Sequence, residues 1–168
     1  MESDDVNSFR VSVSKDYLVF ASAHFITFQG HRCETLHGHN YRVGIAVEGS
    51  LDDEVRFVVD FSVLKQIARR LVDAVDHKVL LPLENPKLAI AESDEQVSVA
   101  VHGQPRYVFP RRDCALLPIA NTTAEMLAEY IGQQVREALA AEGVTHLALL
   151  ELEVEESPGQ AATWRTVL

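Results

Sequence analysis

The stretch His37–Val47, which reads HGHNYRVGIAV, carries the pattern on which the predicted fold rests. Every second residue from Tyr41 to Val47 is apolar, which is the periodicity of a β-strand with one buried face. Residues two apart in a strand point to the same side, so His37 and His39 continue this buried face toward its end. We therefore expect a strand that carries two imidazoles on the side facing the core.

An earlier segment supplies a third histidine. Residues 9–13 alternate apolar and polar side chains, and the apolar run Val19–Phe25 contains His24 near its end. If this strand pairs with the next through the polar loop Gln29–Thr35, His24 meets the two histidines of the HGH motif. Three imidazoles and an open fourth position form the ligand set of catalytic zinc. The alternative is that His24 is a hydrogen-bonded core histidine.

The next patterns predict a third strand and a helix. Apolar residues alternate over Val55–Phe61, as in a strand, and then recur every three or four positions over Leu64–Val75, as in an amphipathic helix. Asp60 or Ser62 is suited to cap the N-terminus of that helix.

A second helix is expected to open near Thr122, because Thr122 and Glu125 have the spacing of a capping box, and to end at Gly143. Two strands follow, a long one over His146–Glu156 and a short one over Ala161–Val167.

The segment between the helices, from about residue 84 to 118, is less regular and contains a hairpin pattern at Val97–Phe109. Strands that can pair as sequence neighbours, together with few helices, favour an antiparallel α+β fold. The length suits one core, so we expect residues 1–168 to form a single domain with an insert at about 84–118.

Composition excludes several classes of protein. Lys and Arg number 15 against 25 Asp and Glu, and the resulting charge of −10 argues against a nucleic-acid-binding module. Two cysteines, Cys33 and Cys114, are too few for a disulfide scaffold. The first eight residues lack the basic and apolar regions of a signal peptide, and no apolar run approaches the ~20 residues that span a membrane. We expect a soluble cytoplasmic protein with no membrane or nucleic-acid partner.

Two further motifs point to proton transfer. Cys33 lies in the polar loop four residues before His37, where a nearby cation or metal would favour its thiolate; it is otherwise a fourth metal ligand or an ordinary exposed cysteine. Asp76 and His77 follow the first helix, and a carboxylate beside an imidazole can form a proton relay. Helix-end residues of the same types are also common.

Glu156 is in phase with the apolar face of the last long strand, which predicts that its carboxylate points inward beyond Val154. An inward carboxylate needs a partner, and a ligand with N–H donors would serve. The alternative is that the strand ends at Val154 and the alternation with it.

Six pieces of the sequence together resemble the 6-pyruvoyltetrahydropterin synthase family, including its bacterial relatives that make 6-carboxytetrahydropterin. The most specific piece is HRCETLHGHNY at His31–Tyr41. The other five, in family order, are Ala21–His24, Val59–Phe61, Leu71–His77, Asn121–Glu125 and Glu156–Pro158. The resemblance implies the tunnelling fold (T-fold), a four-stranded antiparallel sheet with two helices on one face. Such subunits assemble through their sheets into homo-oligomers, trimer-based, hexameric or tetrameric, with sites near the subunit interfaces.

The resemblance also implies a small pterin substrate such as 7,8-dihydroneopterin triphosphate. It makes Zn²⁺ the cofactor and three histidines its ligands, namely His24, His37 and His39. It makes Cys33 the general base and Asp76 with His77 the relay. It makes Glu156 the anchor of the pterin ring, helped by Thr122 and Thr123.

Three departures concern the reaction rather than the metal or the pterin. Leu81 stands where the family usually has Asn or Asp, the insert is longer than expected, and Glu34 adds a second acid to the cysteine loop. The expected reaction gives 6-pyruvoyl- or 6-carboxy-tetrahydropterin. The alternatives are an aldolase-like cleavage to 6-hydroxymethyl-dihydropterin, a non-catalytic pterin-binding paralogue, and a zinc hydrolase unrelated to pterins.

Overall fold

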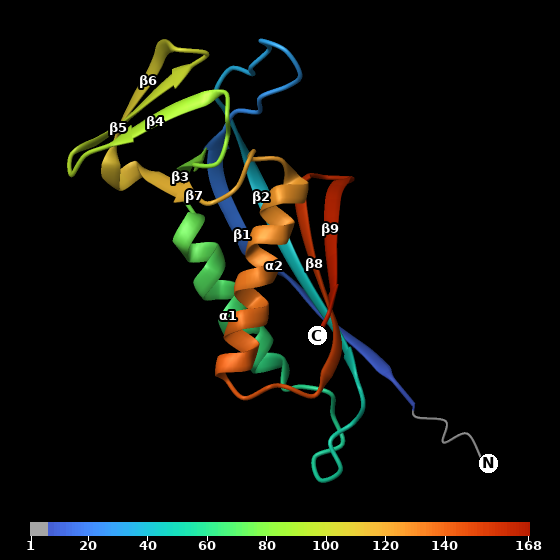
Figure 1. Ribbon diagram of the computed structural model, residues 1–168. Helices are drawn as coiled ribbons and strands as arrows, with labels where there is room; N and C mark the ends of the chain where they lie inside the picture. Colours follow the sequence, from blue (N-terminus) through green and yellow to red (C-terminus); the bar gives the residue numbers. More distant parts are fainter. Residues whose placement is uncertain (1–6) are drawn as a thin grey trace.

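The computed structural model describes residues 7–168, and its centre is a six-stranded sheet in the order β7-β3-β1-β2-β8-β9 (Figure 1). A separate three-stranded sheet has the order β4-β5-β6. The strands are β1 (Phe9–His24), β2 (His37–Gly49), β3 (Lys78–Pro82), β4 (Leu88–Glu92), β5 (Gln96–Val101), β6 (Gln104–Pro110), β7 (Cys114–Leu117), β8 (Leu147–Ser157) and β9 (Gln160–Val167). The helices are α1 (Phe61–Val75) and α2 (Ala124–Ala141), and a 3₁₀ turn covers Arg111–Asp113.

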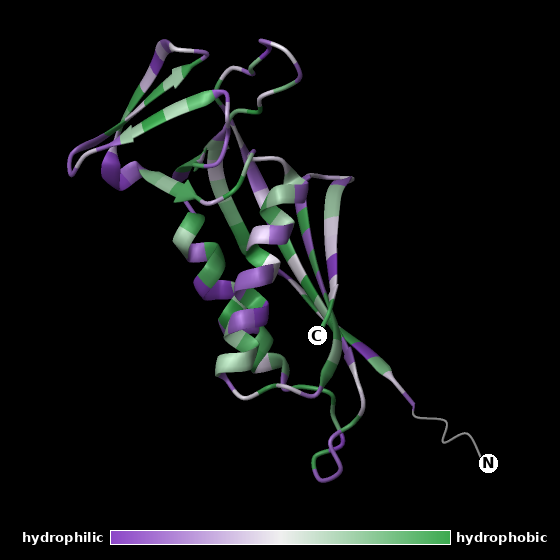
Figure 2. Ribbon diagram, viewed as in Figure 1, coloured by the Kyte–Doolittle hydropathy of each residue, from purple (hydrophilic) through white to green (hydrophobic). Residues whose placement is uncertain are grey.

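Both helices lie against one face of the main sheet, and the core fills the space between them (Figure 1). Bands of hydrophobic and hydrophilic residues alternate along the long strands, as expected for a sheet buried on one side only (Figure 2). The apolar stripes of α1 and α2 close the core through residues such as Leu64, Val72 and Ile131, all at most 2% exposed. The α+β class is thus confirmed, and both predicted helices are present.

A bulge in β1 decides which side His24 faces. Ser14 pairs with Gly44 of β2, but the next pair joins Val19 to Arg42, so β1 uses three more residues than its partner over this step. An odd number of extra residues reverses which positions point inward. Val13 is therefore buried before the bulge, whereas Phe20 is buried after it. The same phase takes His24 to the inner face.

The predicted third strand at Val55–Phe61 is wrong. Residues 51–60 form turns, in which the Asp52 carboxylate accepts hydrogen bonds from the amides of Glu54 and Val55. Val58 and its neighbour Val59 are both buried, which a one-sided strand cannot achieve. Asp60 is confirmed as the cap of α1, since its carboxylate accepts the Ser62 amide at 2.7 Å.

The four-stranded description of the sheet is also wrong. The antiparallel strands β1, β2, β8 and β9 are present, but β3 pairs parallel to β1 and β7 parallel to β3, which makes a mixed sheet of six. Strands β3 and β7 have five and four residues. Runs this short, without alternation, give no clear strand signal.

The insert is larger than a hairpin. The predicted hairpin is confirmed as β5 and β6, with His102 and Gly103 at φ 49° and 79° in the turn, but β4 adds a third strand. One face of this small sheet packs on the base of the loop after β1 through a cluster that includes Phe25, Leu81 and Val99. Among the described residues, no helix has the length and apolar character to cross a membrane.

Candidate metal centre and active site

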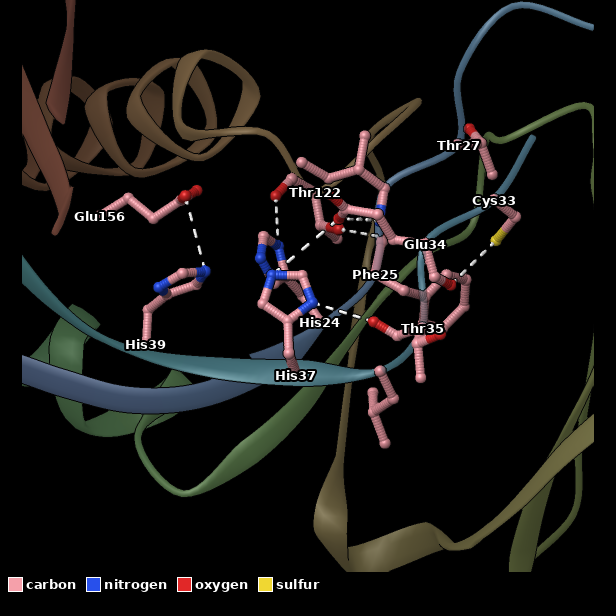
Figure 3. A network of polar contacts seen from close by, with 12 residues as sticks. His24, Phe25, Thr27, Cys33, Glu34, Thr35, His37, His39, Thr122 and Glu156 are labelled. Atoms are coloured by element: carbon pink, nitrogen blue, oxygen red, sulfur yellow. Dashed lines mark hydrogen bonds and ion pairs between the residues drawn. The ribbon is translucent and has the colours of Figure 1, made fainter.

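Three histidines meet at the end of β1 and the start of β2. In the antiparallel register His24 pairs with His37, and Ser22 pairs with His39, so all three rings project from one face (Figure 3). One nitrogen from each ring lies within 4.8 Å of the others, and within the described chain they form the one such group of three or more His, Cys, Asp or Glu. The ring centroids are 4.7, 4.9 and 5.2 Å apart. The predicted convergence is confirmed.

Hydrogen bonds fix the tautomers of two of these rings. His24 Nδ1 lies 2.8 Å from the Thr122 carbonyl oxygen, and His37 Nδ1 lies 2.9 Å from that of Thr35. A carbonyl oxygen can only accept, so each Nδ1 carries the proton and each Nε2 keeps a lone pair. Histidine ligands of a metal usually donate the proton of their other ring nitrogen to a carbonyl or carboxylate in this way.

Two of the free nitrogens have no hydrogen-bond partner. The Nε2 atoms of His24 and His39 are buried and without a hydrogen bond, as is the Tyr41 hydroxyl beneath them. Unpaired buried polar atoms are costly, and a divalent cation at the centre would satisfy the two imidazoles together. The residues therefore fit a three-histidine zinc site with an open position.

Burial lowers the pKa of His24, and the neighbouring His37 and His39 lower it further, although the Thr122 carbonyl and the Glu156 carboxylate oppose them. The imidazole is fully enclosed. A lowered pKa keeps it neutral, which is the form that coordinates a metal.

Glu156 lies on the inward side of β8, as its phase predicted. Its carboxylate Oε1 is 3.5 Å from His39 Nε2, too far for a strong hydrogen bond. Leu152 and Val154 of the same face are fully buried. The carboxylate therefore reaches the edge of the histidine group with accepting capacity to spare (Figure 3).

Glu34 brings a second carboxylate to the histidines. Its Oε2 is 3.9 Å from His37 Nε2 and accepts the Ile26 amide at 3.2 Å. The Glu34 amide in turn donates to the Ile26 carbonyl at 2.9 Å. No role was predicted for this residue, although its position three residues before His37 was a usable signal.

Cys33 faces away from the histidines. Its thiol lies 3.5 Å from the Glu34 carbonyl oxygen, beyond Glu34 as seen from the metal ligands (Figure 3), and it packs on the cluster under the insert. Burial raises the pKa of the thiol and the Glu34 carboxylate adds to this, while the Arg106 guanidinium opposes both. Cys33 is not among the side chains that converge on the metal position.

Asp76 and His77 form a pair at the junction of α1 and β3. Asp76 accepts the Ala21 amide at 2.8 Å and lies 2.9 Å from His77 Nδ1. Burial works to raise the pKa of Asp76, but the Ala21 amide and His77 outweigh it and the pKa is lowered. The His77 side chain is 82% exposed, so its second nitrogen is open to solvent.

The two threonines differ in position. Thr122 is fully buried, and its hydroxyl donates to the Phe25 carbonyl at 3.1 Å while its own carbonyl orients His24. Thr123, rather than Thr122, caps α2, since its hydroxyl accepts the Met126 amide at 3.3 Å. Thr122 thus orients a histidine of the site, whereas Thr123 fixes the start of α2.

The chain matches a known protein family over most of its length. The family model for 6-pyruvoyl tetrahydropterin synthase matches residues 12–166. The chain belongs to the 6-pyruvoyl tetrahydropterin synthase family. A putative 6-carboxy-5,6,7,8-tetrahydropterin synthase of Methanocaldococcus jannaschii is 34% identical over 90% of this chain and 91% of its own.

Solved structures of the same family agree. The 6-pyruvoyl tetrahydropterin synthase of Plasmodium vivax has a TM-score of 0.90 and 32% identity, covering 96% of this chain and 99% of its own. That of Plasmodium falciparum has a TM-score of 0.88 and 34% identity, with the same coverage. Two further Plasmodium vivax structures are described as catalytic residue mutants, in which a glutamate is replaced by alanine or by cysteine.

Proposed function

We propose that this protein is a zinc-dependent tetrahydropterin synthase that acts on 7,8-dihydroneopterin triphosphate or a close pterin, with Glu34 as the group that accepts the proton. The products would be 6-pyruvoyl- or 6-carboxy-tetrahydropterin. One observation carries the proposal: the Glu34 carboxylate, and not the Cys33 thiol, lies beside the three histidines. A glutamate is also the residue called catalytic in the Plasmodium vivax relative.

Zn²⁺ held by His24, His37 and His39 would bind the hydroxyls of the pterin side chain and make the adjacent proton more acidic. Glu34 would be close enough to take that proton, since its Oε2 lies 3.9 Å from His37 Nε2, the nitrogen that would face the metal. The proton would pass from the side-chain carbon to the carboxylate, the C–H electron pair would form a double bond to the ring carbon, and the C=N π pair would move to the ring nitrogen, which takes up a proton. Triphosphate would then leave from the neighbouring side-chain carbon on the way to the 6-pyruvoyl product. The protonated Glu34 can later return the proton.

Glu156 is suited to hold the pterin ring. A pterin presents a 2-amino group and a ring N–H side by side, and one carboxylate can accept both in a charge-assisted pair. The distance of 3.5 Å from Oε1 to His39 leaves the carboxylate close to the metal but free of a strong hydrogen bond. The ring would thus be fixed with its side chain over the histidines.

The Asp76–His77 pair would act in an oligomer. The exposed His77 ring is held by Asp76 but lies outside the histidine group of its own chain. We propose that it completes the site of a neighbouring copy, because an imidazole that is held in place but 82% exposed lies away from the metal-binding group of its own chain.

The same carboxylate favours a second reaction. If Glu34 takes the proton of the second side-chain hydroxyl instead of a C–H proton, that carbon becomes the carbonyl of a released aldehyde and its C–C bond to the first side-chain carbon breaks. The electron pair of that bond passes into the ring system, and reprotonation of the first side-chain carbon gives 6-hydroxymethyl-dihydropterin. A carboxylate readily accepts a hydrogen bond from a hydroxyl, whereas a protonated thiol such as Cys33 does not. This aldolase-like cleavage is therefore the alternative to test.

The deciding experiment is incubation of the zinc-loaded protein with 7,8-dihydroneopterin triphosphate, followed by mass spectrometric identification of the product. Binding without turnover would leave the non-catalytic paralogue as the better description. The two loop residues form a matched pair of variants. We expect Glu34→Gln to keep its zinc and lose about 10²-fold or more in rate, the usual scale for a general base.

Cys33→Ala tests the original expectation that the thiol is the base, which stays a prediction. On the present proposal this variant keeps both zinc and most of its turnover. A loss of 10²-fold in Cys33→Ala, with Glu34→Gln close to the parent, would assign the proton transfer to the thiol instead. Loss of zinc in Cys33→Ala would make Cys33 a ligand.

A further inference from the structure

Two neighbouring side chains of the insert contact the loop that carries Glu34. The Leu36 amide donates to the Tyr107 hydroxyl at 3.2 Å, and Arg106 Nη2 donates to the Glu34 carbonyl at 2.9 Å. Arg106 Nε also donates to the Tyr107 hydroxyl at 3.1 Å, which ties the pair together. The peptide groups on both sides of Thr35 are thus held from β6.

The same short segment is connected to the site on its other side. The Thr35 carbonyl oxygen accepts the His37 Nδ1 proton at 2.9 Å, and the Glu34 carboxylate accepts the Ile26 amide at 3.2 Å. A shift of the Glu34–Leu36 backbone would therefore move the carboxylate and turn the His37 ring. The contacts from Arg106 and Tyr107 restrain the two groups together.

The loop has little regular structure to hold it otherwise. Between β1 and β2 it forms one isolated bridge, Thr27 to Cys33. Other contacts from the insert anchor its first half: Lys87 donates to the carbonyls of Phe28 and Gly30, and Asn85 donates to the Thr27 hydroxyl. These contacts from the insert add to hydrogen bonds within the loop, from the Phe28 amide to the Arg32 carbonyl and from the Glu34 amide to the Ile26 carbonyl, in fixing its conformation.

We propose that Arg106 and Tyr107 are positioning residues for Glu34. They hold the backbone at Glu34 and Leu36 so that the carboxylate faces the metal position while the adjacent Cys33 thiol turns away. The insert thereby sets which of two neighbouring reactive side chains enters the active site. This inference rests on the proposed role of Glu34 as proton acceptor, and it concerns only how that residue is aimed.

Tyr107→Phe is the test variant, because it removes the hydroxyl alone. The ring can keep its packing on Phe25 and Phe109, with centroids 5.4 Å from each. Arg111→Gln is the matched control: Arg111 belongs to the same insert and binds Glu92 and the Cys114 carbonyl, but none of its hydrogen bonds reaches the loop. The measurements are kcat, KM, zinc content and hydrogen exchange of the Leu36 amide.

We expect the Leu36 amide of Tyr107→Phe to exchange at least about tenfold faster, with unchanged zinc content. We expect kcat to fall about tenfold and KM to stay within about twofold, since misplacement of a reacting group affects the chemical step more than binding. Arg111→Gln should match the parent in all four measurements. An unchanged kcat in Tyr107→Phe, or an equal fall in Arg111→Gln, would overturn the proposal.

A double variant separates this inference from the proposed function. In a Glu34→Gln background, Tyr107→Phe should cost no further turnover, because there is no carboxylate left to aim. The same tenfold loss in that background would show that Tyr107 acts on something else. If Glu34→Gln itself keeps full activity, the proposed function fails, whereas faster exchange at Leu36 would still report the contact. Should Tyr107→Phe not fold, Arg106→Lys replaces it, since it keeps the charge and loses the hydrogen bonds of the guanidinium.

Discussion

Gly132 of α2 lies so close to Trp164 of β9 that even one added methyl group would collide with it. A Cβ built on Gly132 would be 2.3 Å from Trp164 Cε3 and 2.6 Å from Cζ3. The indole is partly buried against the main core and therefore has little room to retreat. Gly132→Ala thus tests how tightly the second helix is seated on the edge strand β9, which pairs with the strand that carries Glu156.

Two effects of opposite sign set the size of the stability change in Gly132→Ala. Alanine in place of glycine inside a helix stabilises by about 1 kcal/mol. Overpacking a well-filled site costs about 1–3 kcal/mol, and contacts as short as these call for the upper end. The net expectation is a destabilisation of about 2 kcal/mol, or a Tm lower by about 4–8 °C for a chain of this size.

Thermal unfolding of the metal-free protein, followed by circular dichroism, measures the change. The control is the same substitution in a Trp164→Leu background, where the collision is absent and the alanine should raise the Tm. Gly132→Ala with a Tm equal to or above that of the parent would refute the packing described for α2 and β9.

Three further outcomes are expected. Glu156→Gln should weaken pterin binding by calorimetry about tenfold or more, since lost charge-assisted contacts cost about 1–3 kcal/mol each, with zinc content unchanged; binding as tight as the parent's would exclude Glu156 as the ring anchor. Asp76 has a lowered pKa in the folded chain. The stabilisation that its ionised carboxylate gives the folded state is therefore complete above about pH 4 and is lost as the pH falls toward the pKa of the folded state. Urea unfolding of Asp76→Asn should accordingly depend less on pH below about 4 than the parent does, and parallel curves would contradict this. In size-exclusion chromatography at micromolar concentration the protein should elute as a homo-oligomer, whereas elution as a monomer would count against a site completed by His77 of a neighbouring copy.

The part of the site that lies on strand β2 could be predicted from the sequence, because a two-residue period with one buried face fixes which side chains point inward. His37, His39 and, on β8, Glu156 follow this rule. His24 reached the same face for a reason that no pattern revealed. The bulge between Ser14 and Val19 reversed the phase of β1.

The choice between Cys33 and Glu34 could not be predicted, because adjacent loop residues point in different directions and the loop backbone has no period of its own. The contacts that orient it come from Arg106 and Tyr107, 72 and 71 residues away in the sequence from their partners. The false strand at Val55–Phe61 has a similar cause. Buried Val58 and Val59 take part in a turn that packs on the core, and their apolar character imitated alternation.

The pairing of His24 directly opposite His37 gives the metal position a part in selecting the native chain arrangement. A slip of one residue between β1 and β2 would send His37 and His39 to the uncovered side of the sheet, while His24 stayed within. No three-imidazole group would then exist. A cation that binds only the native register would add its whole binding free energy to that register and none to the slipped one. A metal ion present during folding would therefore favour the native alignment of β1 and β2 before any substrate binds.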